Sequence, residues 1–433
     1  MVVGYVQKAS EAAVRKTLSY RYYIYAVITA AYFIIYFHRT STAAMAPELV
    51  AAFGITPTAV GFIGSMYFYA YALGQLPAGI LADRWGARKT LSLFVMLAGL
   101  GAIFLGQANN YGTVLAARFL VGLGSGFVFV SATRILSDWF KRNEFATYCG
   151  ILTAIGNIGS LASTAPMIAL MAFIGWRGAM TTVGLSSLVI AILLCLIVRN
   201  KPYEIGGASI ADIENIPPVD TIPLGIGESL KILVGKYNFW TIAVMFFVLY
   251  GTIMGFQGLW GGPFLMNVYH LTNAQAGKLL TMIPIGMIGG CLMVGILADR
   301  VVKSKKKVAM VGIFGYILTW IPLVFWIDSM SLSFIRVLLL LYGIFGGTFA
   351  LMSGNLQENI DLRMTGTALG VLNFCAFSGG ALYQQIMAAI IARAPVGNDI
   401  IAASGFKSAF TVCLVTLVIA WIIYLTQKDV TAS

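Results

Sequence analysis

The chain has 433 residues, of which 59% are hydrophobic and only 10% are charged, and its formal net charge is +12. Soluble domains are usually about 45–50% apolar and about 25% charged, so this composition argues against a soluble enzyme, a nucleic-acid-binding protein, a disordered protein and a secreted disulfide scaffold. An all-α membrane protein that crosses the lipid bilayer many times remains.

Apolar runs of about 20 residues recur along the chain and predict twelve transmembrane helices. In chain order they cover 23–48, 58–81, 89–107, 111–137, 145–172, 178–198, 237–266, 275–297, 308–327, 334–357, 366–392 and 404–426. The residues before the first run are polar and basic and lack the apolar segment of a signal peptide, so we expect the first helix to be retained.

One long polar stretch divides the twelve runs into six and six. Residues 199–236 contain Pro202, Pro217, Pro218 and Pro223 and no run that could cross a bilayer, which predicts a cytoplasmic linker. We therefore expect an N-terminal tail (1–22), a six-helix bundle (23–198), the linker (199–236), a second six-helix bundle (237–426) and a C-terminal tail (427–433).

The basic residues indicate how the chain sits in the membrane. Most of the 28 Lys and Arg residues lie between apolar runs on one side of this arrangement. This positive-inside pattern places both termini in the cytoplasm, indicates the inner or plasma membrane and accounts for the net charge without a nucleic-acid partner. The five cysteines form no CxxC pair, and the GxxxxGK[ST] and HExxH motifs are absent. We therefore expect no disulfide framework, metal, cofactor, enzyme activity or ATP-driven pump.

An internal repeat relates the two halves. With a shift of 216 residues (271 minus 55), residues 55–84 align without a gap on 271–300; the hexapeptide GILADR occurs in both, and Gly61 pairs with Gly277. Two homologous six-helix halves are typical of alternating-access transporters, whose substrate site lies between the halves near the middle of the membrane.

Residues 79–89 (GILADRWGARK) resemble the GxLaDrxGrk motif of the major facilitator superfamily, and residues 118–124 (RFLVGLG) resemble its helix 4 pattern. The resemblance covers the whole chain and implies a monomeric secondary active transporter. It also implies a cytoplasmic clasp that holds one conformation, formed by Gly79, Asp83, Arg84, Gly86 and Arg88 and, in the second copy, by Asp299 and Arg300. We expect Gly79 to let two helices approach closely.

One cation lies deep in the first predicted helix. Arg39 continues a stripe of polar side chains at helical spacing, formed by Tyr25, Thr29, Tyr32 and Tyr36, whereas none of the 16 acids is plainly in the middle of a helix. A buried arginine is tolerable if it faces a watery cavity and meets an anion. The alternative is an arginine near the membrane surface that extends to the headgroups.

The resemblance extends to two organic-anion branches of the superfamily, the organophosphate:phosphate antiporters and the sialin-like anion:cation symporters. In both, an arginine of helix 1 binds the anionic group of the substrate, and Arg39 matches its position. Gly255 stands where the antiporters have a second arginine, which disfavours a phosphate ester. His38 and Ser125 stand where the symporters have acids. His38 is thus a candidate for proton coupling or a structural residue.

Further substrate contacts are expected from several helices. The candidates besides Arg39, His38, Tyr32 and Tyr36 are Tyr67, Tyr71, Gln257, Trp260, Asn355 and Asn373. Each could instead bond two helices together.

The sequence therefore predicts transport of a small organic anion, most simply a monocarboxylate, driven by a co-transported proton or sodium ion or by an exchanged anion. Efflux of amphipathic drugs or siderophores is one alternative. A transporter-like receptor that binds its ligand without turnover is another.

Overall fold

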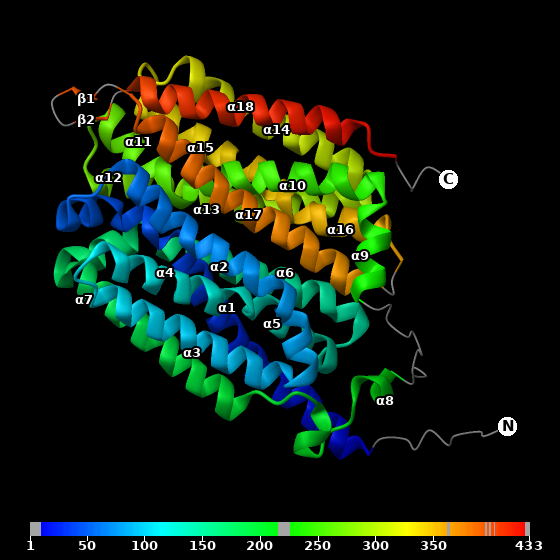
Figure 1. Cartoon of the computed structure of the whole chain (residues 1–433). Helices are drawn as coiled ribbons and strands as arrows, with labels where there is room; N and C mark the ends of the chain where they lie inside the picture. Colours follow the sequence, from blue (N-terminus) through cyan, green and yellow to red (C-terminus); the bar gives the residue numbers. More distant parts are fainter. Residues whose placement is uncertain are drawn as a thin grey trace.

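The computed structural model describes residues 10–214, 226–361, 364–394, 396–397, 400–401 and 403–428, and these are helical almost throughout (Figure 1). Three of the predicted linker prolines, Pro217, Pro218 and Pro223, lie outside the described residues. Ten helices or continuous helical runs are long and apolar enough to cross a membrane, and α2 and α6 complete the predicted twelve. The all-α fold expected from the composition is confirmed.

The first half of the chain forms one helical bundle. Its helices are α1 (Glu11–Phe53), α2 (Pro57–Arg84), α3 (Ala87–Gly106), α4 (Tyr111–Gly126), α5 (Val128–Trp139), α6 (Arg142–Ala162) and α7 (Ala165–Ile197). Side chains of Ser10, Thr56 and Asn110 cap α1, α2 and α4 by accepting a hydrogen bond from a backbone N–H of the first turn.

A glycine divides α7 into two segments. Gly175 has φ 70° and ψ 165°, a conformation that non-glycine residues rarely adopt, and it interrupts the helical backbone. Residues 165–174 therefore extend the fifth span beyond α6, and residues from 176 onward form the sixth span. This division agrees with the predicted runs 145–172 and 178–198.

Short helices η1 (Pro202–Ile205), α8 (Ile210–Glu214) and α9 (Ile226–Val234) follow, and then the second bundle. Its elements are α10 (Tyr237–Gly255), η2 (Phe256–Trp260), α11 (Gly261–Val268), α12 (Asn273–Leu280), α13 (Met282–Ile296), η3 (Leu297–Val301), α14 (Lys305–Phe325), α15 (Leu332–Gly346), η4 (Gly347–Phe349), α16 (Ala350–Glu358), α17 (Thr365–Ile391) and α18 (Ala403–Leu425). A small hairpin of β1 (Val396–Gly397) and β2 (Ile400–Ile401) precedes α18.

The two bundles lie side by side, and the start of α1 and the end of α18 lie at the same end of the molecule (Figure 1). We call this end, which carries Arg84, Arg88 and Lys89, the basic end, and the other the opposite end. The halves meet where α2 packs along α17, α1 against η2, and α6 against α13.

Close contacts join the halves toward the opposite end. Ser65 Oγ of α2 donates a hydrogen bond to the carbonyl oxygen of Ala381 in α17 at 2.7 Å. The hydroxyls of Thr164 and Thr281 lie 3.2 Å apart, and Asn273 donates to the carbonyl of Ala44 at 3.4 Å. These contacts are neutral and cross from one half to the other, so the halves are in contact at this end.

Gly61 allows the closest approach of α2 to α17. A Cβ at Gly61 would overlap the Cβ of Ala388 and lie 3.1 Å from the backbone oxygen of Gln384. Backbone atoms cannot move aside as a flexible side chain can, so a larger residue must push the two helices apart.

We predict that Gly61→Val separates the halves at the opposite end and lowers the free energy of unfolding by about 1–3 kcal/mol. With the five native cysteines replaced, spin labels at positions 52 and 278, both exposed at this end, should report a longer distance in the variant. Gly150→Val is the matched control, since a Cβ there meets nothing within 4 Å. An unchanged distance in Gly61→Val would contradict the close approach.

Candidate substrate site

Arg39 lies where the two halves meet and is only 5% exposed. Its guanidinium carbon is 4.0 Å from the ring centre of Tyr36, 5.2 Å from that of Phe377 and 5.4 Å from that of Tyr71. Tyr36 lies one helical turn before Arg39 on α1, Tyr71 comes from α2, and Phe377 comes from α17 of the second half. Aromatic rings from both halves therefore surround the charge.

No described residue neutralises Arg39. It forms no ion pair within the part of the chain that the structure describes, and its Nε has no hydrogen-bond partner. The polar groups that act on it electrostatically are the hydroxyls of Tyr250, Tyr36, Tyr71 and Tyr67. A buried ion loses several kcal/mol of hydration, and a ring face returns about 0.5–2 kcal/mol. The site therefore favours an anion beside Arg39.

Tyr250 of α10 brings a second unsatisfied group to this place. Its residue is 4% exposed, and its hydroxyl has no hydrogen-bond partner. An unpartnered buried hydroxyl costs about 1–3 kcal/mol. Sequence analysis missed both Tyr250 and Phe377, because both lie in apolar spans. The available signal for Tyr250 was a tyrosine deep within a helix whose central residues are mostly apolar.

Four tyrosines predicted from the sequence gather near Arg39. The Tyr32 hydroxyl donates to that of Tyr36 at 3.2 Å, and the two rings are 4.8 Å apart. The rings of Tyr67 and Tyr71 are 5.9 Å apart on successive turns of α2. Tyr71 in turn lies 3.8 Å, ring centre to ring centre, from Phe377 of the other half. We call Arg39, Tyr36, Tyr71, Tyr250 and Phe377 the central cluster.

The substrate contacts that the sequence predicts in the second half do not lie together in the structure. Gln257 is buried in the π-helical turn η2, and its Oε1 has no partner. Trp260 donates from Nε1 to the carbonyl of Gln384 at 3.0 Å, a bond between η2 and α17. Asn373 is half-buried on α17, one turn from Phe377. Asn355 donates to Tyr424 and Gln427 near the end of the chain, so it does not join the central cluster.

His38 also lies apart from the central cluster. Consecutive helical residues point about 100° apart, and its side chain faces the interior of the first half instead of the interface. Its Nε2 is 3.1 Å from the hydroxyl of Ser187 on α7, and its backbone carbonyl accepts a hydrogen bond from Arg118 at 3.1 Å. Arg118 is fully buried, and its Nε and Nη2 have no partner. Arg118 opens the segment 118–124 that resembles the helix 4 pattern, but its burial was not predicted.

A cavity of about 10 Å³, roughly the space of a single water, lies between the halves at the opposite end. It is lined by residues of α1, the turn between α6 and α7, α7, η2, α11 and α12, including Thr40, Ser163, Gln257 and Gly277. This small volume agrees with the close contacts between the halves at the opposite end.

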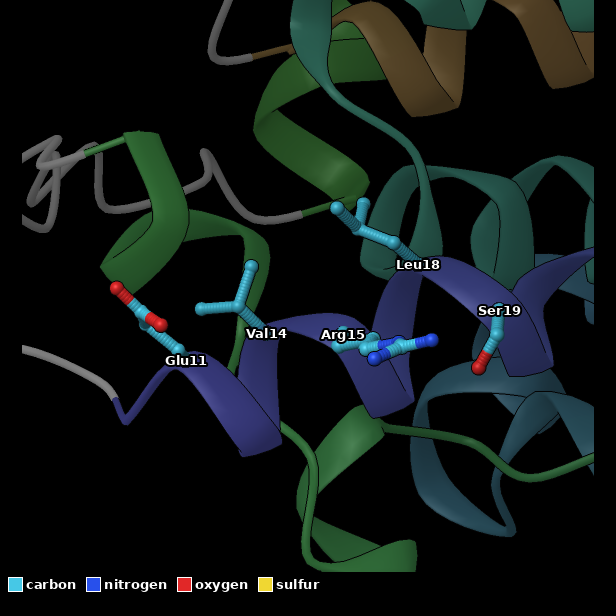
Figure 2. Close-up of a pocket in the computed structure, with 5 residues that line it drawn as sticks. All are labelled: Glu11, Val14, Arg15, Leu18 and Ser19. Atoms are coloured by element: carbon cyan, nitrogen blue, oxygen red, sulfur yellow. The ribbon is translucent and has the colours of Figure 1, made fainter.

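A larger groove lies elsewhere. It measures about 480 Å³ and is formed on the first turns of α1 by Glu11, Val14, Arg15, Leu18 and Ser19 (Figure 2). At 1.5 Å per helical residue, its residues lie about 30 Å or more along α1 from Arg39. This groove is not part of the substrate site. Within the described chain no group of three or more His, Cys, Asp or Glu side chains could hold a metal ion.

The residues of the predicted clasp lie at the basic end. The expectation for Gly79 was wrong in this conformation, because a Cβ there would meet nothing within 4 Å. Gly86 has φ 90°, and the backbone N–H of Arg88 donates to Asn200 at 2.9 Å. The Arg88 guanidinium donates to the carbonyl of Cys195, within the same half. Arg84 and Arg300 are exposed, and the side chains of Asp83 and Asp299 lie outside the described residues.

The sequence profile described as Major Facilitator Superfamily matches residues 28–383. The chain belongs to this superfamily. It is therefore a multi-pass membrane protein of a transporter family and not an enzyme. Among solved structures, a bacterial homolog of the human lysosomal transporter Spinster, in an inward-facing and unoccupied conformation, is 18% identical with a TM-score of 0.72, and the match covers 94% of this chain and 97% of that one. The likeness shows the shared fold.

Curated relatives are similar over most of their length. The probable sulfoacetate transporter SauU of Cupriavidus necator is 24% identical over 83% of this chain and 84% of that protein. The membrane sensor protein UhpC of Salmonella typhimurium is 23% identical, with 66% and 67% covered. The probable L-galactonate transporter of Escherichia coli is 25% identical, with 79% and 77% covered.

We predict that His38 and Ser187 stabilise the fold through their mutual hydrogen bond. His38→Ala, Ser187→Ala and the double variant form a cycle in which thermal or denaturant unfolding should give a coupling of about 1 kcal/mol. A coupling near zero would mean that the His38 side chain points elsewhere and is free to face the central cluster.

Proposed function

We propose that the protein is a secondary active transporter that moves a small organic anion, a monocarboxylate, across the inner or plasma membrane by alternating access. The observation that carries the proposal is the buried charge of Arg39, which lies between the halves without an ion pair among the described residues. Because guanidinium offers paired N–H donors in a plane, a carboxylate is a fitting partner.

The number of buried cations favours a monoanion. Every Lys and Arg of the second half whose side chain the structure describes is half-buried or exposed. Gly255 packs against α17, where a Cβ would lie 2.7 Å from the sulfur of Met387, so a larger side chain at this position would have to displace Met387. A phosphate ester with two charges would meet one buried cation at the central cluster, whereas a carboxylate is matched by it.

The relatives support an organic anion. SauU is named a probable sulfoacetate transporter, and the Escherichia coli relative a probable L-galactonate transporter. Galactonate carries one carboxylate and sulfoacetate carries a carboxylate and a sulfonate, each on a small organic body, so both relatives are named for organic anions and only one of them for a monoanion. The central cluster has the corresponding parts, a cation and several aromatic rings on which such a body can rest.

The driving force is proposed as a co-transported proton or sodium ion or an exchanged anion. None of the Asp and Glu side chains that the structure describes is buried, so the described chain offers no carboxylate within the membrane for proton coupling. The positive-inside pattern supports a cytoplasmic position for the basic end and both termini, and we propose that the carrier works as a monomer.

A second function is favoured by one comparison. UhpC is named a membrane sensor, so a protein of this family can serve as a receptor. A receptor would bind the anion through the same central cluster but would not carry it across the membrane. Efflux of amphipathic drugs, the other alternative, would depend on the aromatic rings far more than on Arg39.

We predict that Arg39→Lys and Arg39→Ala reduce counterflow of the best substrate in proteoliposomes by at least about tenfold, equivalent to about 1.4 kcal/mol. The panel should contain the monoanions benzoate, D-galactonate and L-lactate, the dianions sulfoacetate and glucose 6-phosphate, and a lipophilic cation as the drug probe. Lysine keeps the charge but cannot form the two parallel hydrogen bonds of guanidinium, so both variants should be impaired.

Arg336→Lys is the matched control, since Arg336 is exposed on α15. Near-normal transport by both Arg39 variants would overturn the anion assignment, and export of the cation unaffected by them would indicate drug efflux. Binding of an anion by the purified protein without any counterflow would identify a receptor.

A further inference from the structure

Tyr250 is held firmly in place at the interface. Its ring centre lies 4.9 Å from that of Phe377, with the rings nearly perpendicular, and 6.0 Å and 6.2 Å from those of Phe246 and Phe349. Phe68 of the first half lies 6.5 Å away. Rings from both halves therefore surround it and fix where its hydroxyl points.

The hydroxyl of Tyr250 is unlike those of other buried tyrosines in its half. Tyr342 donates to the carbonyl of Thr252 at 3.2 Å, and Tyr383 donates to the hydroxyl of Thr416 at 2.7 Å. Among the described tyrosines, Tyr250 is the one whose buried hydroxyl has no partner. A phenylalanine would fill the same space without burying a polar atom, so packing alone does not explain a tyrosine.

An unsatisfied group of the other half shares a neighbour with Tyr250, because the ring centre of Phe377 lies 5.2 Å from the Arg39 guanidinium carbon and 4.9 Å from the ring centre of Tyr250. Arg39 acts electrostatically on Tyr250, and its Nε is also without a partner. Guanidinium has donors and no acceptor, and a phenol carries one donor. An ionised carboxylate has acceptors and no donor, so a single carboxylate can accept hydrogen bonds from both groups at once.

We propose that Tyr250 is the substrate-binding residue of the second half and donates a hydrogen bond to the carboxylate that Arg39 binds. The substrate then connects α1 of the first half to α10 of the second. This assignment rests on the proposed function. It adds that Tyr250 acts together with Arg39 to distinguish a carboxylate from a neutral analogue.

The bridge gives the substrate a part in the conformational cycle. A carboxylate held by both halves stabilises conformations in which α1 and α10 are close, and it binds less well when they separate. A neutral amide or ester of the same acid offers a weaker acceptor to both donors and should bind poorly.

The test is the binding of benzoate, D-galactonate and L-lactate to the full-length protein in nanodiscs by isothermal titration calorimetry. We expect Tyr250→Phe to weaken binding of whichever acid binds the wild type by at least about tenfold, which is about 1.4 kcal/mol. Its melting temperature without ligand should not fall, because no hydrogen bond of the unliganded protein is lost. The matched control is Tyr342→Phe, which loses the bond to Thr252 and should melt earlier but bind the acid as the wild type does.

Three results separate the ideas. If the acid binds Tyr250→Phe within twofold of the wild type while Arg39→Lys loses it, the bridge is wrong and the proposed function stands. If the wild type binds no acid of the panel, the proposed function fails and the bridge fails with it. Should Tyr250→Phe not fold, Tyr250→Met provides the same comparison, and unchanged affinity there would overturn the bridge equally.

Discussion

The positive charge of Arg39 is the constraint on which the central part of the structure depends. It is buried where the halves meet, and no described carboxylate lies against it. Aromatic faces from α1, α2 and α17 shield the charge only partly, since a ring returns a fraction of the lost hydration. A bound anion would compensate the rest of the hydration free energy that Arg39 loses on burial. Binding and release of the anion would therefore change the strength of the association between the two halves.

The described ion pairs lie within each half, which allows the interface between the halves to open and close. The described ion pairs, Arg21–Glu144, Arg134–Asp138 and Lys305–Glu358, each join two residues of the same half. Apart from the Arg39 guanidinium against the Phe377 ring, the contacts described across the interface, such as Ser65 with Ala381 and Thr164 with Thr281, are neutral hydrogen bonds and close helix packing. Neutral contacts can be broken and reformed without leaving an unpaired charge in the membrane. Each half can therefore stay rigid while the interface opens and closes.

Local sequence patterns predicted the fold well because each membrane helix corresponds to an apolar run long enough to cross the bilayer. The twelve spans and the turn near Gly175 follow from such patterns, and helical spacing alone placed Tyr32, Tyr36 and Arg39 on one face. The partners from the other half depend on how two distant helices pack, which no local pattern records. Tyr250 and Phe377 were missed for this reason. His38 was predicted as a substrate contact because it precedes Arg39 in the sequence. Neighbouring residues of a helix lie on different faces, however, and the His38 side chain lies against Ser187.

An experimental structure of the protein with a bound carboxylate would test the central claim most directly. With benzoate, or with whichever acid of the panel binds tightest, our account predicts carboxylate density in contact with the Arg39 guanidinium, between α1 of the first half and α10 of the second. Arg39 turned toward lipid headgroups, or the acid bound elsewhere while Arg39 keeps only its aromatic neighbours, would contradict it.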